Sequence, residues 1–326
     1  MSFQKINYGI IGAGHIGNFH SQQIQNIKPS VHVVGIYDIN FKQAQKIALQ
    51  NNIVAFKNLT ELLSLCDAVS IATPADTHTA IALQALEEKC HVFIEKPLAT
   101  TIADCKQIIA SAERNKALVQ VGHIERFNPA FVIFNKSNQD IPQFIESKRL
   151  TPFTKRGIDT NVILDLMIHD IDLILYLVKS EIESIDANGI SILTNSFDLV
   201  NARLSFKNGC VASLTASRIS DSPMRKLRFF SKYKYTSLDF QKHQLMTYRV
   251  EKKLTKPSLK SIFSFDNKSI LLDKQIVPNN NALFEELLSF IMSIHKSQDI
   301  QVSAWDGLHA IEVAIMIQNK INEKSY

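Results

Sequence analysis

The chain has 326 residues, which is too long for one ordinary hydrophobic core and predicts two domains. Hydrophobic residues make up 45% of the sequence and charged residues 21%, proportions that exclude a disordered chain. No run of about 18 uninterrupted apolar residues occurs, so we expect no membrane span. The first apolar run, residues 8–11, is broken at once by glycines and does not resemble a secretory signal.

Cysteine usage and net charge narrow the class of protein further. The four cysteines show no metal-ligand spacing and predict reduced thiols in a reducing, cytoplasmic compartment. The formal net charge of +5 suits an acidic small molecule or weak binding to nucleic acid. The densest basic stretch, residues 225–234, alternates with apolar and aromatic side chains, which is typical of strands with one solvated face. We therefore expect no nucleic-acid partner.

In the first part of the chain, short apolar runs alternate with helical periodicity. The runs are residues 8–11, 31–37, 68–72, 92–95 and 117–121, with a weaker one at 53–56. A helix pattern follows Thr101, which is spaced from Asp104 as in a capping box. Strands that alternate with helices predict parallel strands joined by right-handed crossovers. Residues 1–122 are therefore predicted to form a doubly wound α/β domain of the Rossmann type.

In residues 123–326 several strand patterns follow one another without helices between them. This order predicts an α+β domain with an open, mainly antiparallel sheet. Residues 199–206 and 210–216 alternate, and Asn208-Gly209 between them predicts a tight hairpin. Further strand-like runs lie at 226–230 and 235–240, whereas the polar stretch 251–281 predicts loops and short strands. Helical patterns at 162–178, 282–294 and around 305–321 complete this part, and the last helix can pack back on the first domain.

The glycine-rich run at residues 12–17 is a candidate cofactor loop. It reads Gly-Ala-Gly-His-Ile-Gly, directly follows a short strand and opens a helical stretch. Gly12 permits the tight turn, Gly14 the approach of a pyrophosphate, and Gly17 close packing of helix on strand. The phosphates would lie at the helix N-terminus, with His15 and Ile16 among their neighbours. The alternative is a glycine-rich loop that arose by chance.

Polar residues at the ends of the other strands complete the predicted cofactor site. Asp38 lies 21 residues beyond Gly17 and would accept hydrogen bonds from ribose hydroxyls while repelling a 2′-phosphate, so we expect NAD rather than NADP. In an open parallel sheet the ligand lies beyond the carboxyl ends of the strands. The later strands end there in Thr73, Pro74, His78, Glu95, Lys96 and His123. For His78 the alternative is a surface residue at the start of a helix.

Lys96, between Glu95 and Pro97, is a candidate for catalysis. A cation at the expected nicotinamide position can hold a substrate hydroxyl and stabilise negative charge as a carbonyl forms. The alternative is a surface lysine in a proline-containing turn.

The helix predicted at 162–178 is apolar nearly all round except for one polar stripe. Asp165, His169, Asp172 and Tyr176 fall within an arc of about 60° on a regular helix. Such a stripe is predicted to face a polar cavity, with bulk solvent as the alternative. Asp165 can orient the imidazole of His169 and raise its basicity. We expect no metal site, because the sequence places no third ligand.

Taken together, residues 12–17, Asp38, residues 95–97 and the Asp165-x-x-x-His169 helix resemble the Gfo/Idh/MocA oxidoreductases. The resemblance spans essentially the whole chain, and this combination of motifs is specific. It implies a Rossmann domain followed by a sheet whose open face serves oligomerisation, here as a dimer or tetramer. It also implies catalysis by Lys96, Asp165 and His169, and a Lys96–Pro97 bond that is cis.

A narrower likeness lies in residues 121–129, 149–157 and 162–170. These segments are similar to the branch of the family that oxidises C3 of UDP-N-acetylglucosamine to a 3-keto nucleotide sugar, a step of lipopolysaccharide biosynthesis. The chain departs from many family members in lacking the glycines before the Asp-x-x-x-His helix, where residues 161–164 read Asn-Val-Ile-Leu. This departure weakens the transfer of substrate contacts from members that act on sugars and polyols.

The residues predict the following chemistry. His169, held by Asp165, takes the proton of a secondary hydroxyl and Lys96 positions that oxygen, although the sequence leaves open which of Lys96 and His169 is the base. Guanidinium groups suit paired phosphate oxygens, so the candidates for gripping a UDP-sugar are Arg126, Asn128 and Arg156; the alternative is salt bridges between domains or subunits. Competing functions are oxidation of another sugar or inositol, reduction of a carbonyl or imine, and non-catalytic NAD sensing.

Overall fold

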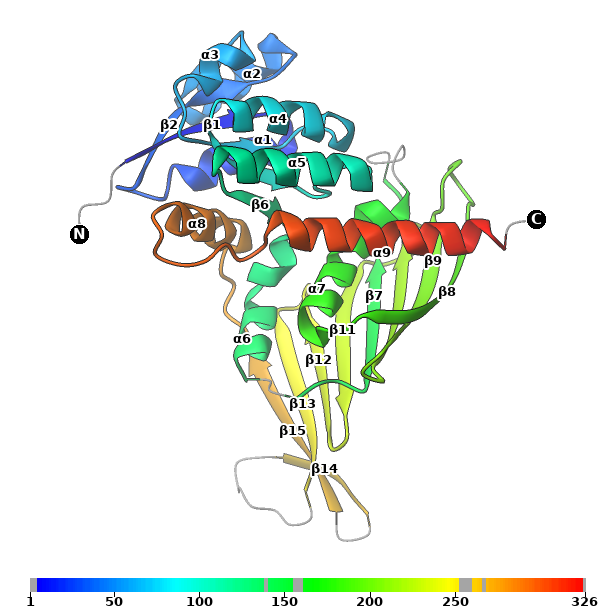
Figure 1. The fold of residues 1–326 in the computed structure, drawn as a ribbon. Coiled ribbons are helices and arrows are strands. Elements are labelled where there is room, and N and C mark those ends of the chain that lie inside the picture. Colours follow the sequence, from blue (N-terminus) through cyan, green and yellow to red (C-terminus); the bar gives the residue numbers. More distant parts are fainter. Residues whose placement is uncertain (1–4, 138–139, 155–160, 252–259, 266–267, 325–326) are drawn as a thin grey trace. The chain divides into compact units, whose positions relative to one another are not determined.

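The computed structural model describes residues 5–137, 140–154, 161–251, 260–265 and 268–324 (Figure 1). Its contacts divide the chain into two compact units. Unit 1 is Met1–Phe127 with Asn281–Glu312, and unit 2 is Asn128–Asn280 with Val313–Tyr326. The chain thus returns to unit 1 after completing most of unit 2. Among the described residues, no helix combines the length and the apolar character needed to cross a membrane.

Unit 1 is built on a six-stranded sheet in which every neighbouring pair is parallel. The strand order is β3-β2-β1-β4-β5-β6. The chain adds strands outward from β1 to β3 on one side and then from β4 to β6 on the other, as in a dinucleotide-binding fold. The strands are β1 (Ile6–Ile11), β2 (Val31–Tyr37), β3 (Val54–Phe56), β4 (Ala68–Ile71), β5 (His91–Glu95) and β6 (Val119–Gly122). The predicted doubly wound sheet is therefore confirmed.

Helices connect these strands and cover the sheet. They are α1 (His15–Ile24), α2 (Phe41–Asn51), α3 (Leu59–Leu63), α4 (His78–Glu87) and α5 (Ile102–Asn115), with the short 3-10 turns η1 (Ala75–Thr77) and η2 (Ile124–Phe127). The predicted cap of α5 is present, because the Thr101 hydroxyl oxygen accepts a hydrogen bond from the Asp104 amide at 3.1 Å.

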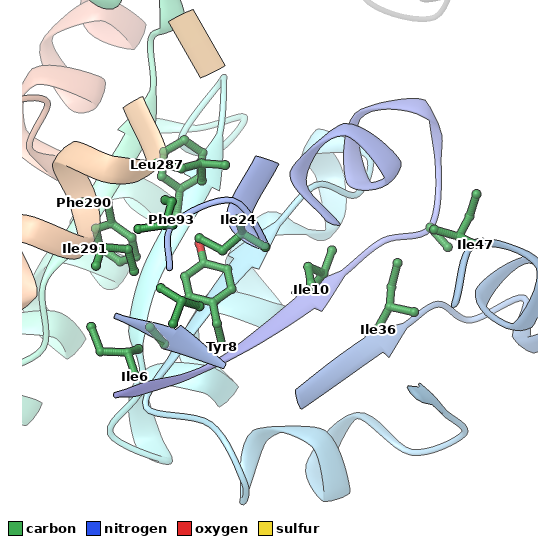
Figure 2. Packing of buried hydrophobic residues seen from close by; sticks show 14 of the residues in the cluster. Ile6, Tyr8, Ile10, Ile24, Ile36, Ile47, Phe93, Leu287, Phe290 and Ile291 are labelled. Atoms are coloured by element: carbon green, nitrogen blue, oxygen red, sulfur yellow. The ribbon is translucent and has the colours of Figure 1, made fainter. Parts of the chain in front are cut away.

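The core of unit 1 includes a helix from the far end of the chain. α8 (Ala282–Ile294) places Leu287, Phe290 and Ile291 against side chains of the sheet, among them Tyr8 and Phe93 (Figure 2). The Phe93 and Phe290 rings meet edge to face with centroids 5.9 Å apart. Each such side chain contributes about 1.5–3 kcal/mol by leaving water. This packing fixes the part of the sheet from which the cofactor loop emerges.

Unit 2 is built on a nine-stranded sheet in the order β14-β15-β13-β12-β11-β7-β10-β9-β8. Within the described part of this sheet only β7 and β10 pair in parallel, and the other neighbours are antiparallel. The strands are β7 (Phe144–Leu150), β8 (Ile182–Ile190), β9 (Leu199–Phe206), β10 (Val211–Ser217), β11 (Met224–Ser231), β12 (Lys234–Asp239), β13 (Gln244–Glu251), β14 (Lys260–Phe265) and β15 (Lys268–Ile276). The predicted open, mainly antiparallel sheet is confirmed.

Two helices pack on this sheet, α6 (Pro129–Ser137) against β12 and β13, and α7 (Ile168–Val178) against β7. The final helix, α9 (Ala304–Asn322), contains the boundary between the units. The hairpin predicted at Asn208-Gly209 joins β9 and β10. The polar stretch 251–281 was predicted as loops and short strands, but nine of its residues form β15, which pairs along the whole of β13.

Candidate active site

The glycine loop has the geometry that a dinucleotide requires. Gly12 has a φ of +101°, in the region that favours glycine, and a Cβ there would lie 2.5 Å from the Ala72 carbonyl oxygen. A Cβ at Gly17 would collide with the carbonyl oxygen of Gly12, so the first turn of α1 lies directly on the strand end. A Cβ at Gly14 would meet nothing within 4 Å. The loop is thus open where a pyrophosphate would approach.

The N-terminus of α1 is suited to an anion. No side chain caps it, and its first turn contains no acidic residue. Its first amide groups and the helix dipole therefore favour negative charge at this point. The neighbouring His15 and Ile16 are exposed, and the His15 ring packs edge-on against Phe19 with centroids 4.6 Å apart. The residues present fit a bound dinucleotide phosphate.

Asp38 follows β2 directly, and its carboxylate is held in place by the backbone. Oδ2 accepts a hydrogen bond from the Ala13 amide at 2.7 Å, and Oδ1 accepts one from the Asn40 amide at 2.8 Å. The carboxylate is therefore tied to the glycine loop, where the sequence predicts a contact to a ribose. Its remaining lone pairs can accept from sugar hydroxyls, since each carboxylate oxygen accepts more than one bond.

The tip of β4 carries Thr73, Pro74 and His78. Thr73 is half-buried and Pro74 is exposed. His78 begins α4 as the sequence alternative suggested, but the expectation that it lies on the surface is wrong, because the ring is buried. Its Nδ1 lies 2.8 Å from the Pro97 carbonyl oxygen and its Nε2 lies 2.9 Å from the Thr73 carbonyl oxygen. Both ring nitrogens are engaged within unit 1, which favours a bracing role over direct cofactor binding.

The tip of β5 carries Glu95, Lys96 and Pro97. Glu95 and Lys96 are half-buried, and the Lys96–Pro97 bond is cis, as the resemblance implied. The Glu95 Oε1 lies 2.9 Å from Nε2 of His20, a buried residue of α1. The motifs did not single out His20. The signal that was passed over is spacing, since His20 lies three residues after Gly17 on the helix that follows the glycine loop.

The tip of β6 and the segment after it contain His123, Arg126 and Asn128. His123 is buried. The Arg126 side chain is 7% exposed; its guanidinium lies 3.0 Å from Asp306 and donates to the Gln301 carbonyl oxygen at 3.1 Å. Burial raises the pKa of Asp306, but Arg126 and hydrogen bonds from Ser303 outweigh it and the pKa is lowered.

These contacts bear on the role expected for two of the three candidates for phosphate binding. The ion pair of Arg126 lies within unit 1, so its geometry favours internal support over substrate binding. Asn128 caps α6, because its Oδ1 accepts a hydrogen bond from the Ala130 amide at 3.1 Å. Arg156 lies outside the described residues.

In unit 2, the residues of the polar stripe predicted on the long apolar helix are only partly exposed. Asp165, His169 and Tyr176 are half-buried and Asp172 is buried, which favours the predicted polar cavity over bulk solvent. The Tyr176 hydroxyl accepts a hydrogen bond from Asn135 at 3.1 Å. The Tyr176 end of the stripe is thus held by a side chain of α6.

The start of this helix departs from the regular geometry on which the predicted 60° arc rests. Ile163–Met167 forms a π-helical turn, and α7 follows from Ile168. Asn161 holds the turn, because its Oδ1 accepts from the amides of both Ile163 and Leu164 at 3.0 Å. Asp165 therefore lies on a wider turn than His169. Turns of this kind occur frequently at functional sites.

A buried ion pair beside His169 escaped the sequence reasoning. Arg149 on β7 places Nη2 2.8 Å from Oδ1 of Asp170, and its Nε lies 3.2 Å from both carboxylate oxygens. Each side chain is 4% exposed. Inward-facing positions of β7 alternate as Ile145, Ser147 and Arg149, so a charged residue in the inward register was the available signal. The pair ties the helix that carries His169 to the centre of the sheet.

Comparison with known proteins shows the family. Residues 6–123 match the model for an oxidoreductase family with an NAD-binding Rossmann fold, and residues 120–231 match the GFO/IDH/MocA C-terminal domain. The chain is 37% identical over 240 residues to UDP-N-acetylglucosamine 3-dehydrogenase of Acidithiobacillus ferrooxidans, covering 74% of this chain and 76% of that protein.

Two further similarities agree with this assignment. A solved structure of the Acidithiobacillus enzyme matches with a TM-score of 0.88 at 30% sequence identity, over 98% of each chain. Inositol 2-dehydrogenase/D-chiro-inositol 3-dehydrogenase of Halalkalibacterium halodurans is 32% identical over 193 residues, covering 56% of each chain. With the open glycine loop, the strand-end carboxylate and the Glu-Lys-Pro turn in place, the chain belongs to the Gfo/Idh/MocA family of NAD-binding oxidoreductases.

Proposed function

We propose that this protein is an NAD-dependent sugar dehydrogenase that oxidises C3 of UDP-N-acetylglucosamine to the 3-keto sugar. The observation that carries the proposal is the similarity to UDP-N-acetylglucosamine 3-dehydrogenase over most of both chains, together with a loop that fits a dinucleotide. The net charge of +5 suits a substrate that carries a diphosphate.

The cofactor is NAD rather than NADP because of Asp38. Its carboxylate is fixed at the end of β2 by two backbone amides, so it cannot easily turn away from an incoming ribose. A 2′-phosphate at that ribose would meet a like charge, which disfavours NADP. When bound, NAD supplies the hydride acceptor at C4 of its nicotinamide ring.

The chemistry of the chain itself is a proton transfer coupled to loss of the hydride. His169, oriented by Asp165, accepts the proton of the C3 hydroxyl as the C3–H bond gives up its electron pair with the hydrogen. The C3–O bond becomes a carbonyl, and Lys96 offsets the negative charge on that oxygen during the transfer. The products are the 3-keto nucleotide sugar, NADH and a proton on His169.

The test of the substrate is a panel of UDP-sugars and free inositols incubated with NAD and followed by NADH absorbance. Reduction of NAD by UDP-N-acetylglucosamine, well above that by UDP-glucose and by inositols, supports the proposal. Inositol oxidation is the second candidate function, favoured by the identity to the Halalkalibacterium enzyme. A panel in which an inositol is the best substrate would replace the first candidate by the second.

The test of the catalytic group separates chemistry from cofactor binding. We expect His169→Ala to lower kcat by at least about a hundredfold, the usual contribution of a general base, while the NADH dissociation constant stays within about threefold. His32→Ala, an exposed histidine on β2, is the matched control and should leave both quantities unchanged. If Lys96→Met abolishes turnover but His169→Ala does not, the lysine is the base instead.

The open sheet of unit 2 is proposed as the surface of a homodimer or homotetramer. Strands β11, β12 and β13 carry a row of stacked rings. The ring centroids of Phe230 and Tyr235 lie 4.7 Å apart, and those of Tyr235 and Tyr248 lie 5.0 Å apart. These half-buried rings offer a partner chain apolar area at little cost in conformational entropy. Sedimentation of the wild type against Tyr235→Glu tests this, since a charge in the row should shift the species toward monomer.

A further inference from the structure

Beneath the turn that carries Lys96 runs a chain of four hydrogen-bonded side chains, all in unit 1. The Tyr8 hydroxyl lies 2.6 Å from the Ser70 hydroxyl, and that hydroxyl lies 2.9 Å from Nδ1 of His20. Nε2 of His20 then lies 2.9 Å from Oε1 of Glu95. The members come from β1, β4, α1 and β5, so the chain joins the switch point of the sheet to the tip of β5.

The direction of the bonds follows from the chemistry of the end members. Burial raises the pKa of Tyr8, so its hydroxyl keeps its proton and donates it to Ser70. The Ser70 hydroxyl is then free to donate to Nδ1 of His20. A carboxylate oxygen of Glu95 accepts, so the matching tautomer of His20 carries its hydrogen on Nε2. That tautomer satisfies all three hydrogen bonds at once.

Two roles are open to such a chain, and the burial of its members decides between them. A proton relay needs a member at each end that exchanges with water. Only Glu95 has such access, since its side chain is 20% exposed, whereas Tyr8, Ser70 and His20 are fully buried. At the inner end, the last member is Tyr8, which keeps its proton. This series of hydrogen bonds is therefore suited to holding Glu95 in place and not to conducting a proton.

We propose that His20 is a positioning residue, which holds the Glu95 carboxylate and through it the turn that presents Lys96. The inference rests on the proposed function in that Lys96 acts on the substrate. The same carboxylate is confined from the other side, because a Cβ at Gly122 would lie 3.0 Å from its Oε2. The far end of the turn is braced independently by His78 on the Pro97 carbonyl oxygen.

A matched pair of substitutions separates the two nitrogens of His20. The amide of glutamine reaches about as far as Nε2 and can still donate to Glu95, whereas the amide of asparagine reaches only as far as Nδ1. We expect His20→Asn to lower kcat about tenfold, the usual effect of losing one hydrogen bond to a charged group. His20→Gln should stay within about threefold of the wild type. Tyr8→Phe, which removes only the innermost hydroxyl, should lie closer still.

A double-mutant cycle with Glu95→Ala, which removes the acceptor of the His20 Nε2 bond, tests whether His20 acts through the carboxylate. For each single variant and for His20→Asn/Glu95→Ala, kcat is measured by NADH absorbance and the NADH dissociation constant by NADH fluorescence. If His20 acts through Glu95, the double variant resembles Glu95→Ala alone in both quantities. Melting temperatures of all variants reveal any general loss of stability. The binding measurement needs no sugar substrate, so it remains informative if the proposed reaction is wrong.

Three results would overturn the proposal. The first is independence, in which the effects of His20→Asn and Glu95→Ala multiply in the double variant. The second is a His20→Gln variant as impaired as His20→Asn, which would mean that the bond to Glu95 does not matter. The third is a Glu95→Ala variant equal to the wild type in both kcat and NADH affinity. A Lys96→Met variant with normal turnover would instead count against the proposed function, while the cycle on NADH binding would still stand.

Discussion

Removing the arginine of the buried Arg149–Asp170 pair should destabilise unit 2 strongly. In Arg149→Met the Asp170 carboxylate, 4% exposed, loses a guanidinium that meets both of its oxygens within 3.2 Å. Breaking a buried ion pair from one side costs about 3–5 kcal/mol, because the remaining charge stays buried without compensation. Urea unfolding followed by circular dichroism measures this loss.

Two further variants test whether the loss of stability comes from the uncompensated charge of Asp170. Arg149→Met/Asp170→Leu removes both charges and should recover most of the loss, since an apolar pair has no uncompensated charge. Arg114→Ala is the matched surface control: its side chain is 67% exposed, its ion pair with Glu87 spans 4.0 Å, and the change should stay within about 0.5 kcal/mol. A loss below about 1 kcal/mol in Arg149→Met, or a double variant as unstable as the single one, would refute the account.

Two other predictions follow from contacts of the site, and a third from Asp198, a buried residue of unit 2 whose Oδ2 accepts hydrogen bonds from three successive backbone amides, those of residues 192–194. Asp38→Asn keeps an oxygen that accepts the Ala13 amide but loses the charge, so the preference for NAD over NADP, measured as the ratio of kcat/KM values, should fall at least about tenfold. His78→Leu removes both bonds to the Thr73 and Pro97 carbonyl oxygens, so it should lower the melting temperature and weaken NADH binding; a variant equal to the wild type in both would contradict the bracing role. Burial alone would raise the pKa of Asp198, but three backbone amides outweigh it and lower the pKa to about 2, so its stabilisation is present above about pH 4 and is lost as the pH falls toward 2. Asp198→Asn should therefore flatten the dependence of stability on pH in that window, and an unchanged slope would disprove the assignment.

The parts of the fold that follow local rules could be predicted from the sequence. The glycine loop, the cap at Thr101 and the hairpin at Asn208-Gly209 each depend on residues close together in the chain. The parallel sheet was predictable because strand and helix patterns alternate along the chain. β15 was underestimated because its residues, Lys268–Ile276, are polar at many positions and gain their strand structure from pairing with β13. That pairing is a tertiary effect which a local pattern does not show.

The candidate site also has a part that could be predicted from the sequence and a part that could not. Motif positions such as Gly12, Asp38 and Lys96 were predictable, because a short spacing fixes their place at the tips of the strands. The partners that support them come from distant segments: His20 reaches Glu95 across 75 residues, and Arg126 reaches Asp306 across 180. Arg126 was expected to grip a phosphate because a lone arginine gives no sign of its partner. The π-helical turn at Asp165 is also invisible to a pattern that assumes regular helical spacing.

The central claim is that the hydrogen on C3 of a UDP-linked sugar passes to a nicotinamide bound at the glycine loop. UDP-N-acetylglucosamine deuterated at C3 tests this in one measurement, with NAD as acceptor and mass spectrometry of the reduced cofactor and the sugar. Transfer of the C3 hydrogen to the nicotinamide would leave one deuterium in NADH and none at C3 of the 3-keto product. Deuterium that stays in the sugar, or NADH that forms without the label, would contradict it.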